Sequence, residues 1–390
     1  MLHGISKKQM ILNFGPQHPA SHGVLRLIIT LMGEYVYEID PNIGFLHRGT
    51  EKLLELQPLL QASVFMDRLD YTSVLTQTHA YCMCAERILA CSLADNDTRL
   101  LRTLLDEFSR ILNHLLSLAT HALDIGTMAT LFWAFEDRER IMELFEYVSG
   151  ARMHLALYTP GQSLGMIVSR EFFIRCAIII KNMQKTFTEL YVALYNNRVW
   201  RLRLVNIGIA TSALVQQFCL SGPVARSAGV LLDLRLAVSS DYGSYSNHKV
   251  VSFFGTHGDS YCRYLLRLRE PFESTRIIYG ILPQLSEQTY CITKCCKNNA
   301  IFNRNSLFDC LPSGTHDVTT DSNTSFVEAG KGIFGITITT NNNSVPYRVG
   351  IHSPAYKHLQ ALGALLSGHQ IADIATLLGT LDIVFGEVDR

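Results

Sequence analysis

The residues best suited to acid–base chemistry lie in short polar clusters of an otherwise apolar chain. His18 and His22 occur four residues apart in the segment FGPQHPASHG. Pro16 and Pro19 favour extended conformations in the residues before them, so this spacing is not the zinc-binding pair of a metalloprotease helix. We interpret the segment as a rigid loop that directs side chains. The alternative is a loop whose histidines only bond to the backbone.

Other ionisable residues interrupt segments that are otherwise apolar. Burying such groups costs free energy, which a functional role could justify. Each of them alone is also consistent with a buried group whose hydrogen bonds are satisfied, or with a helix cap. Their concentration in short segments is therefore what indicates a function. They are Asp124 in THALDIG, Asp67, Arg68, Asp70 and Tyr71 in FMDRLDYTS, His47 and Arg48 in GFLHRGTEK, and Arg152 and His154 in SGARMHLAL.

The composition limits the class of protein. The 390 residues are 48% hydrophobic and 17% charged, yet they contain no run of about eighteen apolar residues that would form a transmembrane helix. Basic and acidic residues balance at 34 each, which gives no support for electrostatic binding of nucleic acid. A chain this apolar is expected to cover part of its surface with partner proteins.

The ten cysteines do not have the spacing of a metal site. The densest groups, CMC and CITKCC, lack the CxxC spacing usual for zinc or iron–sulfur ligation, so a site at CITKCC is an unfavoured alternative. Most of the ten cysteines lie in apolar surroundings, where a free thiol behaves as a small hydrophobic group. Free thiols in this number favour a reducing compartment.

Two β-hairpins are predicted, one near each end of the chain. Apolar and polar residues alternate over 24–39 around a turn at Gly33. GIFGITITT and YRVGIH, joined by an NNNS turn, predict the second hairpin. The residues of the first hairpin expected to follow one pattern are Leu25, Leu27, Ile29 and Leu31, then Tyr35, Tyr37 and Ile39.

Helical periodicity dominates the remaining sequence. An apolar stripe predicts a helix over 98–123, capped by Asp97 or Thr98, and the next helix should stop at Gly150. Further helices are predicted within 50–92, over 169–196, over 257–280 with a kink or break at Pro271, and as a pair separated near Gly368.

No repeat or long linker divides the chain, so a single domain is predicted for residues 1–390. Its parts are an N-terminal loop and hairpin (1–40), a helical core (41–296), a surface loop rich in Asn, Ser and Thr (297–330), and a hairpin followed by helices (331–390). The expected fold class is mainly α with small β elements (α+β).

Six segments together resemble the family of quinone-site core subunits of respiratory complex I, the NADH:quinone oxidoreductase. They follow the order of the family and span nearly the whole chain, which makes the resemblance specific. The segments are FGPQHPASHGVLRL, GFLHRGTEKL, DRLDYTS, THALDIG, EYVSGARMH and DIVFGEVDR.

The resemblance implies a fold related to the large subunit of [NiFe] hydrogenases, with β-hairpins around a helical core. A hydrogenase holds its nickel and iron with four cysteine thiolates. The matching positions here are Asp70, Ser73, Val384 and Glu387. The chain therefore lacks that ligand set, which excludes a functional hydrogenase, and we expect it to bind no metal of its own.

For this family the resemblance implies quinone reduction in the cavity that the metal would occupy. Tyr71 and His22 would then flank the quinone headgroup as proton donors, and Asp124 would pair with His22. Loss of the imidazole proton would leave Asp124 with an unpaired charge, which gives a route to a conformational signal. His18 and Asp70 are expected to support the cavity.

The resemblance places Arg48, Arg68 and His154 near an iron–sulfur cluster of a neighbouring subunit. Positive charge and hydrogen bonds near a cluster raise its potential, and a titrating His154 would couple that potential to pH. Arg48 matches a position that is methylated in some members. Electrons are expected from the neighbour because this chain has no ligands for a redox centre.

The resemblance also implies partners and location. The neighbouring subunit would carry a [4Fe–4S] cluster, membrane-arm subunits would lie at the quinone entry, and NADH and FMN would bind elsewhere in the complex. Proton translocation would belong to the whole complex. We expect the matrix-side peripheral arm at the mitochondrial inner membrane, with the cytoplasmic side of a bacterial plasma membrane as the alternative. The start of the first motif close to Met1 suggests a gene without a cleaved leader.

A degenerate relative that only scaffolds the assembly is the competing hypothesis. The joint presence of Tyr71, His22 and Asp124 argues against it, because a scaffold has no chemical need of these groups. Some segments depart from the family: QSLGMIVS after YTPG is short, residues 205–256 match loosely, and CITKCCKNNA has no clear counterpart.

Overall fold

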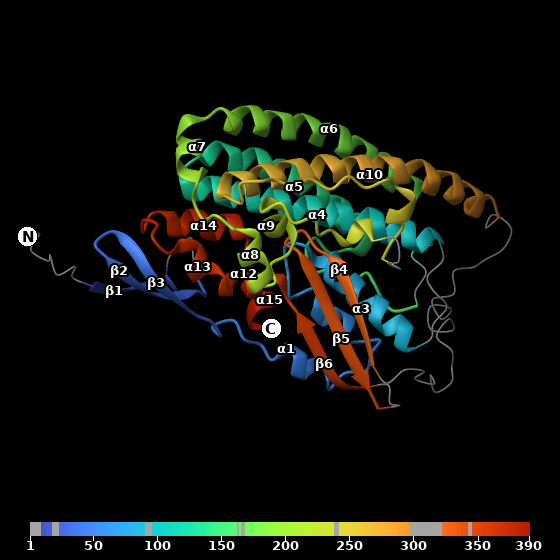
Figure 1. Cartoon of the computed structure of the whole chain (residues 1–390). Helices are drawn as coiled ribbons and strands as arrows, with labels where there is room; N and C mark the ends of the chain where they lie inside the picture. Colours follow the sequence, from blue (N-terminus) through green and yellow to red (C-terminus); the bar gives the residue numbers. More distant parts are fainter. Residues whose placement is uncertain are drawn as a thin grey trace, which may run out of the picture.

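Long helices form a bundle along one side of the molecule, and two small sheets lie on the other side (Figure 1). Short C-terminal helices lie between the bundle and the N-terminal sheet. The structure, a computed structural model, confirms the mainly α class with small β elements. It describes residues 9–17, 23–89, 96–161, 164, 168–237, 242–295, 322–341 and 345–390, with the backbone alone for 286–295.

The bundle is built around one central helix, α4, which packs against two other bundle helices, α5 and α10. Nearly every side chain of α4 from Leu100 to Leu115 is buried. The helix predicted to stop at Gly150 does so, because Gly150 adopts a left-handed conformation (φ 78°) and its N–H bonds to the Glu146 carbonyl at 2.8 Å. The bundle helices are α4 (Asn96–Ile125), α5 (Met128–Ser149), α6 (Arg170–Tyr195) and α10 (Ser260–Cys295).

Of the two alternatives predicted at Pro271, a kink or a break, helix α10 excludes the break. It begins at Ser260, next to Asp259, whose carboxylate accepts the Cys262 N–H at 2.8 Å, and it continues through Pro271 to Cys295. Its packing against α4 and α6 compensates for the hydrogen bond that proline cannot donate. The backbone of the CITKC part of CITKCC is therefore helical, while Cys296 lies outside the described residues.

The segment 50–92 contains three separate helices in its described part. A proline and a polar turn interrupt the periodicity there. The sequence prediction of helices in this segment is confirmed, and the predicted helix over 169–196 is α6. The helices are α1 (Thr50–Leu54), α2 (Ser63–Met66) and α3 (Val74–Ile88).

The N-terminal sheet confirms the first hairpin and adds a strand that was not predicted. Its antiparallel order is β1-β2-β3, and its register shifts between Thr30 and Leu31. Because of this shift, Val36 is buried, whereas Tyr35 and Tyr37 are 54% and 55% exposed. The expectation that both tyrosines continue the buried pattern is wrong. The strands are β1 (Gln9–Phe14), β2 (Arg26–Met32) and β3 (Tyr35–Asn42).

The C-terminal sheet confirms the second hairpin and corrects the loop predicted over 297–330. Residues 322–328 of that segment form a strand whose Ser325, Val327 and Glu328 are buried, and it packs on α3. Its polar composition concealed the alternation. Residues 297–321 lie outside the described part. The strands are β4 (Ser322–Glu328), β5 (Ile333–Thr340) and β6 (Pro346–His352).

Four short helices, rather than two, follow the second hairpin, and the predicted separation near Gly368 falls between two of them. They are α12 (Pro354–Gln360), α13 (Leu362–Leu366), α14 (Asp373–Leu381) and α15 (Phe385–Asp389). The remaining short elements are α7 (Arg198–Leu204), α8 (Ser212–Gln217), α9 (Gly222–Ser227), η2 (Leu234–Leu236) and η3 (Tyr245–Asn247).

The apolar core has two parts. One joins the bundle to α3 and the C-terminal sheet, and the other joins the N-terminal sheet to α9 and the C-terminal helices. The single-domain organisation stays a prediction. Within the described residues, no helix combines the length and apolarity needed to cross a bilayer.

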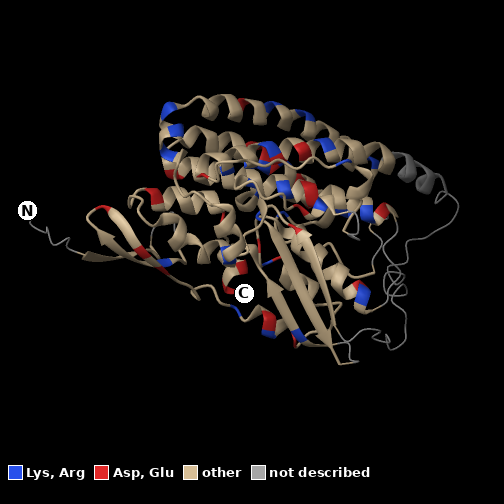
Figure 2. Cartoon of the chain, in the orientation of Figure 1, with Lys and Arg blue, Asp and Glu red and all other residues tan. Residues whose placement is uncertain are grey.

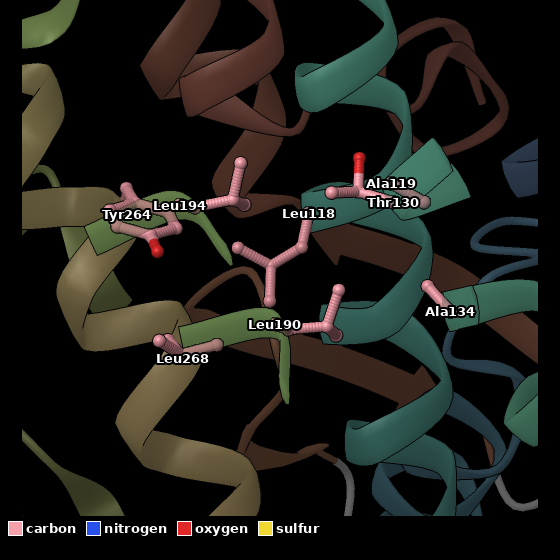
Figure 3. Close-up of a pocket in the computed structure, with 8 residues that line it drawn as sticks. All are labelled: Leu118, Ala119, Thr130, Ala134, Leu190, Leu194, Tyr264 and Leu268. Carbon is pink, nitrogen blue, oxygen red and sulfur yellow. The ribbon is translucent and has the colours of Figure 1, made fainter. Parts of the chain in front are cut away.

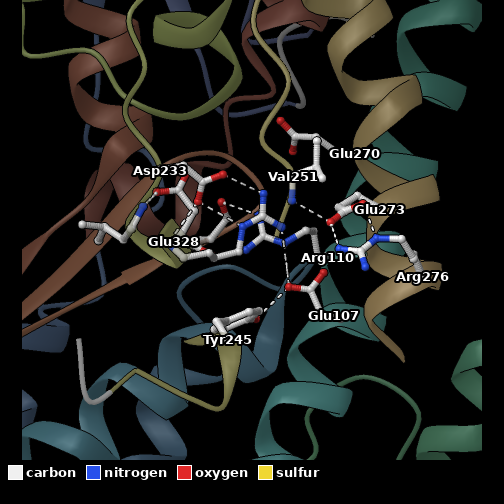
Figure 4. Close-up of polar contacts among 12 residues, drawn as sticks. Glu107, Arg110, Asp233, Tyr245, Val251, Glu270, Glu273, Arg276 and Glu328 are labelled. Carbon is white, nitrogen blue, oxygen red and sulfur yellow. Dashed lines mark hydrogen bonds and ion pairs between the residues drawn. The ribbon is translucent and has the colours of Figure 1, made fainter. Parts of the chain in front are cut away.

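Charged residues occur along the bundle helices (Figure 2), and a network of charged side chains lies where α10 meets α9 and β4 (Figure 4). Arg226 of α9 is buried with Glu270 at 2.7 Å, Glu328 at 2.8 Å and Asp233 at 3.7 Å. Burial favours the neutral acid at Glu270, but Arg226 and His114 outweigh it and hold the pKa of Glu270 well below its usual value. The interior of the chain therefore depends on paired charges as well as on apolar packing.

Arg226→Met is expected to lower the free energy of unfolding by about 3–5 kcal/mol, because it leaves buried carboxylates without their cation. Denaturant titration at pH 7 measures the loss. Arg175→Met is the control, since Arg175 pairs with Glu171 at the surface, where ion pairs contribute little. Equal losses in the two variants would show that the buried cluster does not stabilise the fold.

Candidate functional site

The two segments that carry the hydrogenase-like ligand positions meet in the structure. Gln77 of α3 accepts the Asp70 backbone N–H through Oε1 at 3.0 Å. Its Nε2 donates to Glu387 Oε2, also at 3.0 Å. Ser73 precedes α3 and Val384 precedes α15, so both flank this bridge in sequence and both are buried. The structure thus brings together positions more than 300 residues apart.

A buried lysine occupies the centre of this region. Lys331 Nζ lies 3.1 and 3.0 Å from the two carboxylate oxygens of Asp70, and it also donates to Thr72 Oγ1 and Asn113 Oδ1. Asp382 Oδ2 lies 3.7 Å away. The side chains of Lys331 and Asp70 have no exposed surface. We call Asp70, Lys331, Asp382 and Glu387 the charge cluster.

The turn between β4 and β5 carries Lys331 into the interior. Ala329 and Gly332 close it with reciprocal backbone hydrogen bonds of 2.9 and 3.1 Å. A Cβ at Gly332 (φ 148°) would lie 2.5 Å from Ser221 Oγ, and one at Gly330 would lie 2.7 Å from Asn113 Nδ2. Glycine on both sides therefore allows the close approach. Sequence analysis missed Lys331, although a lysine between two glycines in an apolar hairpin, AGKGIFG, was a usable signal.

The charges in this region compensate one another. Burial disfavours the ammonium of Lys331, but Asp382, Asp70 and Glu387 outweigh this and raise its pKa. Burial, followed by the neighbouring Asp70 charge, raises the pKa of Glu387 to about 8, so Glu387 is mostly protonated at neutral pH. Arg267 Nη1 lies 3.2 Å from Asp382 Oδ2. Lys331 and Arg267 thus face the carboxyl groups of Asp70 and Asp382, beside the mostly neutral Glu387.

Tyr71 lies at the surface side of the cluster. Its neighbours in sequence, Asp70 and Thr72, are buried, whereas Tyr71 is 36% exposed. Burial raises the pKa of Tyr71, Asp70 and Asp382 raise it further, and Lys331 and Arg48 oppose them. The phenol therefore keeps its proton at neutral pH and is available as a hydrogen-bond donor.

Asp124 lies on the same helix as Asn113, which accepts a hydrogen bond from Lys331 of the charge cluster. It stands eleven residues after Asn113 on α4, a spacing that places both on nearly the same helix face, about 16 Å apart along the axis. The residue is exposed, but partial burial of its carboxylate raises its pKa to about 6. Among the residues that the structure describes, none bonds to this carboxylate. His22 and His18 lie outside the described residues, so the His22–Asp124 pair stays a prediction.

Arg48, Arg68 and His154 converge on one backbone segment. Arg48 Nη2 donates to the Arg68 carbonyl at 2.7 Å, and Arg68 Nη1 donates to the Val64 carbonyl, also at 2.7 Å. His154 Nδ1 lies 3.2 Å from the Asp67 carbonyl oxygen. The three positive or titratable groups predicted to act together therefore surround residues 64–68.

The GFLHRGTEK segment and the end of the DIVFGEVDR segment bind each other. The Asp389 carboxylate accepts the N–H groups of Gly44 at 3.0 Å and Leu46 at 2.8 Å, and His47 Nδ1 lies 2.6 Å from its carbonyl oxygen. Arg390 Nη1 donates to Glu51 Oε1 at 3.0 Å. These contacts fix Arg48 and Glu387 relative to each other.

A small apolar cavity elsewhere in the bundle does not belong to this site (Figure 3). None of the predicted site residues lines it. Its lining residues come from α4, α5, α6 and α10 and are Leu118, Ala119, Thr130, Ala134, Leu190, Leu194, Tyr264 and Leu268.

The cysteines of CMC behave as core residues. Cys82 and Cys84 are buried on α3. Burial raises the pKa of the Cys84 thiol to about 12 and that of Cys82 further, so both stay protonated. This agrees with the interpretation of these thiols as small hydrophobic groups.

Comparison with known proteins decides the family. Residues 124–390 match the family described as "Respiratory-chain NADH dehydrogenase, 49 Kd subunit". The chain belongs to this family. The match confirms the resemblance to a complex I core subunit, and it makes the chain a subunit of an oxidoreductase whose other subunits are its partners.

Full-length relatives of the 49 kDa family agree. The NADH-ubiquinone oxidoreductase 49 kDa subunit of Nyctotherus ovalis is 56% identical over 386 residues, 98% of this chain and 94% of the relative. That of Paramecium tetraurelia is 41% identical over 401 residues, 98% of this chain and 100% of the relative. The NADH dehydrogenase [ubiquinone] iron-sulfur protein 2 of Arabidopsis thaliana is 41% identical, with 98% coverage of both chains.

Glu387→Gln tests the raised pKa. With a folded pKa of about 8 against a usual value of 4.5, Glu387 releases a proton on unfolding, so its contribution makes the free energy of unfolding fall as pH rises through that window. The variant lacks this titration. As pH rises from 4.5 to about 8, its free energy of unfolding should therefore increase relative to that of wild type by up to about 1 kcal/mol per pH unit. Denaturant titrations at pH 5 and pH 8 measure the difference, with exposed Glu38→Gln as the control. A pH-independent difference would contradict the assignment.

Proposed function

We propose that the chain forms the ubiquinone-reduction site of complex I together with a neighbouring iron–sulfur subunit, and that Tyr71 donates a proton to the quinone. The observation that carries the proposal is the half-buried phenol of Tyr71, which keeps its proton and lies beside a fully buried charge cluster. The relatives are named as subunits of NADH-ubiquinone oxidoreductase, which supplies the substrate class.

The chemistry requires two electrons and two protons for each quinone. This chain would supply the protons, one from Tyr71 and one from His22, to the two carbonyl oxygens of the ring as it becomes a quinol. A [4Fe–4S] cluster of the neighbouring subunit would supply the electrons. The phenol suits this role because an acid that stays protonated at neutral pH can donate as negative charge develops on the quinone oxygen.

Asp124 would act through His22. A carboxylate beside an imidazole orients the ring and favours its charged form. In the described residues the Asp124 carboxylate has no other partner, and its pKa of about 6 indicates a partly desolvated site that an imidazolium would stabilise. Proton transfer from His22 would leave this carboxylate uncompensated on the same helix as Asn113, which gives a route for a signal along α4.

Arg48, Arg68 and His154 would face the cluster of the neighbouring subunit. Their convergence on residues 64–68 supports this proposal, because it concentrates positive charge and a titratable imidazole in one place. Such a group would raise the potential of a nearby cluster, and the charge state of His154 would make that potential depend on pH.

Membership of the family supports a proposal for the wider assembly. We place the chain in the peripheral arm on the matrix side of the mitochondrial inner membrane, with membrane-arm subunits at the quinone entry. NADH and FMN would bind to other subunits, and proton translocation would be a property of the whole complex. The single-domain, hydrogenase-like organisation of the chain is part of this proposal.

Tyr71→Phe is expected to lower the quinone reductase rate of the assembled complex at least tenfold, because it removes a proton donor and leaves the ring in place. The iron–sulfur signals in electron paramagnetic resonance should be unchanged. Tyr347→Phe, at an exposed position of β6, is the matched control. Full activity in Tyr71→Phe would remove Tyr71 from the mechanism and favour a scaffolding role.

Asp124→Asn is expected to shift the alkaline limb of the pH–rate profile to lower pH. The neutral amide stabilises an imidazolium less than a carboxylate does, so the pKa of His22 should fall and its proton should be lost at lower pH. Asp124→Glu, which keeps the charge, should restore part of the profile. An unchanged limb in Asp124→Asn would reject the pairing.

A further inference from the structure

We propose that Lys331 is a positioning residue for proton donation by Tyr71, through an ammonium that fixes residues 70–72 and keeps positive charge beside the phenol. The inference rests on the function proposed above for Tyr71. It concerns a residue that belongs to neither the predicted site nor the predicted contacts with partner subunits.

The geometry of residues 70–72 is the first argument. Asp70 and Thr72, on either side of Tyr71, both bind Lys331 Nζ, and the Thr72 N–H also bonds to Asp70 Oδ1 at 3.1 Å. The backbone of Tyr71 is thus held from both sides by one buried atom. Because its neighbours are buried and its own ring is exposed, the direction of the phenol is set by these contacts.

The ammonium also ties this loop to the rest of the fold. It donates to Asn113 Oδ1 on α4, and the Asn113 amide donates to Asp382 Oδ2 at 3.0 Å in the connection between α14 and α15. The β4–β5 turn, which carries Lys331, belongs to the C-terminal sheet and reaches α4 (Figure 1). Four segments that are distant in sequence therefore meet at Nζ, so a shift of the lysine would move Tyr71.

The use of a lysine is the second argument. A fully buried ammonium is expensive, and apolar replacements of buried ion pairs often stabilise proteins, so packing alone does not require this residue. Its charge also acts on the phenol, where it opposes the effects of burial, Asp70 and Asp382 on the Tyr71 pKa. A cation at this place favours the phenolate that forms when Tyr71 gives up its proton.

The charged groups with the largest effects on Tyr71 and Lys331 come from several segments of the chain. Removing Lys331 alone would take the cation away from Asp70 and remove a group that lowers the Tyr71 pKa, which makes the phenol a weaker acid. These groups are Lys331 on the β4–β5 turn, Asp70 beside Tyr71, Asp382 and Glu387 near the C-terminal end of the described chain, and Arg48 before α1. Arg267 on α10 pairs with Asp382.

A double-mutant cycle in the assembled complex tests the proposal. Wild type, Lys331→Met, Tyr71→Phe and the double variant are compared by quinone reductase rate, normalised to iron–sulfur content. If Lys331 acts through Tyr71, each single variant loses at least tenfold in kcat, and the double variant is within about twofold of the slower single variant. The KM for quinone should stay within about twofold in Lys331→Met, because the lysine is buried and does not touch the substrate.

Several outcomes would overturn the proposal. A double variant whose loss is the product of the two single losses would show that Lys331 acts independently of Tyr71. A tenfold rise in KM with unchanged kcat would assign Lys331 to quinone binding instead. If Lys331→Met does not assemble, Lys331→Arg takes its place in the cycle. Arginine keeps the positive charge but does not offer a single donor atom. The loss of rate in the double variant is again compared with the losses in the two single variants. Full activity in Tyr71→Phe alone would instead reject the proposed function, so the two failures are distinguishable.

Discussion

An ammonium group enclosed by carboxylate, hydroxyl and amide oxygens is the interaction on which the centre of this chain depends. Lys331 neutralises Asp70 and contributes to the field around Asp382 and Glu387. Without it, Asp70 would be buried without its cation, a condition that proteins avoid because desolvation of an unpaired charge is so costly. The glycines beside Lys331, the left-handed backbone of Asp382 (φ 54°) and the bridging side chain of Gln77 all serve this compensation.

Buried charges are also paired with opposite charges elsewhere in the interior. Arg226 pairs with Glu270, Glu328 and Asp233 in the bundle, so a helix, a 3₁₀ turn and a strand are held by charge as well as by apolar contact. A buried ionic network gives little net stability compared with an apolar core, but it penalises any rearrangement that separates a pair. A fold of this kind can present a titratable group such as Tyr71 in one fixed environment.

Local sequence patterns were enough to predict the long helices and both hairpins. Features that depend on tertiary contacts could not be predicted from the sequence. The stripe of α4 and the glycine after α5 act within a few residues, so they are visible in sequence. The path of α10 through Pro271 depends on α4 and α6, and the exposure of Tyr35 and Tyr37 depends on a register shift. In the site, the motifs identified Asp70 and Glu387, but Lys331 has meaning only beside partners that are far away in sequence.

The contacts between residues 387–389 and residues 44–77 also have a consequence for the order in which the chain folds during synthesis. Asp389 binds the backbone of residues 44 and 46, and Glu387 binds Gln77. These bonds cannot form before residues 387–390 have left the ribosome, long after residues 44–77 have done so. The packing of α4 on α5 and of α5 on α6 joins helices that follow one another in sequence and can form early, whereas this region closes late, as expected for pairings of high sequence separation. The region of the proposed quinone site is therefore expected to close only after both of the distant segments that form it have been made.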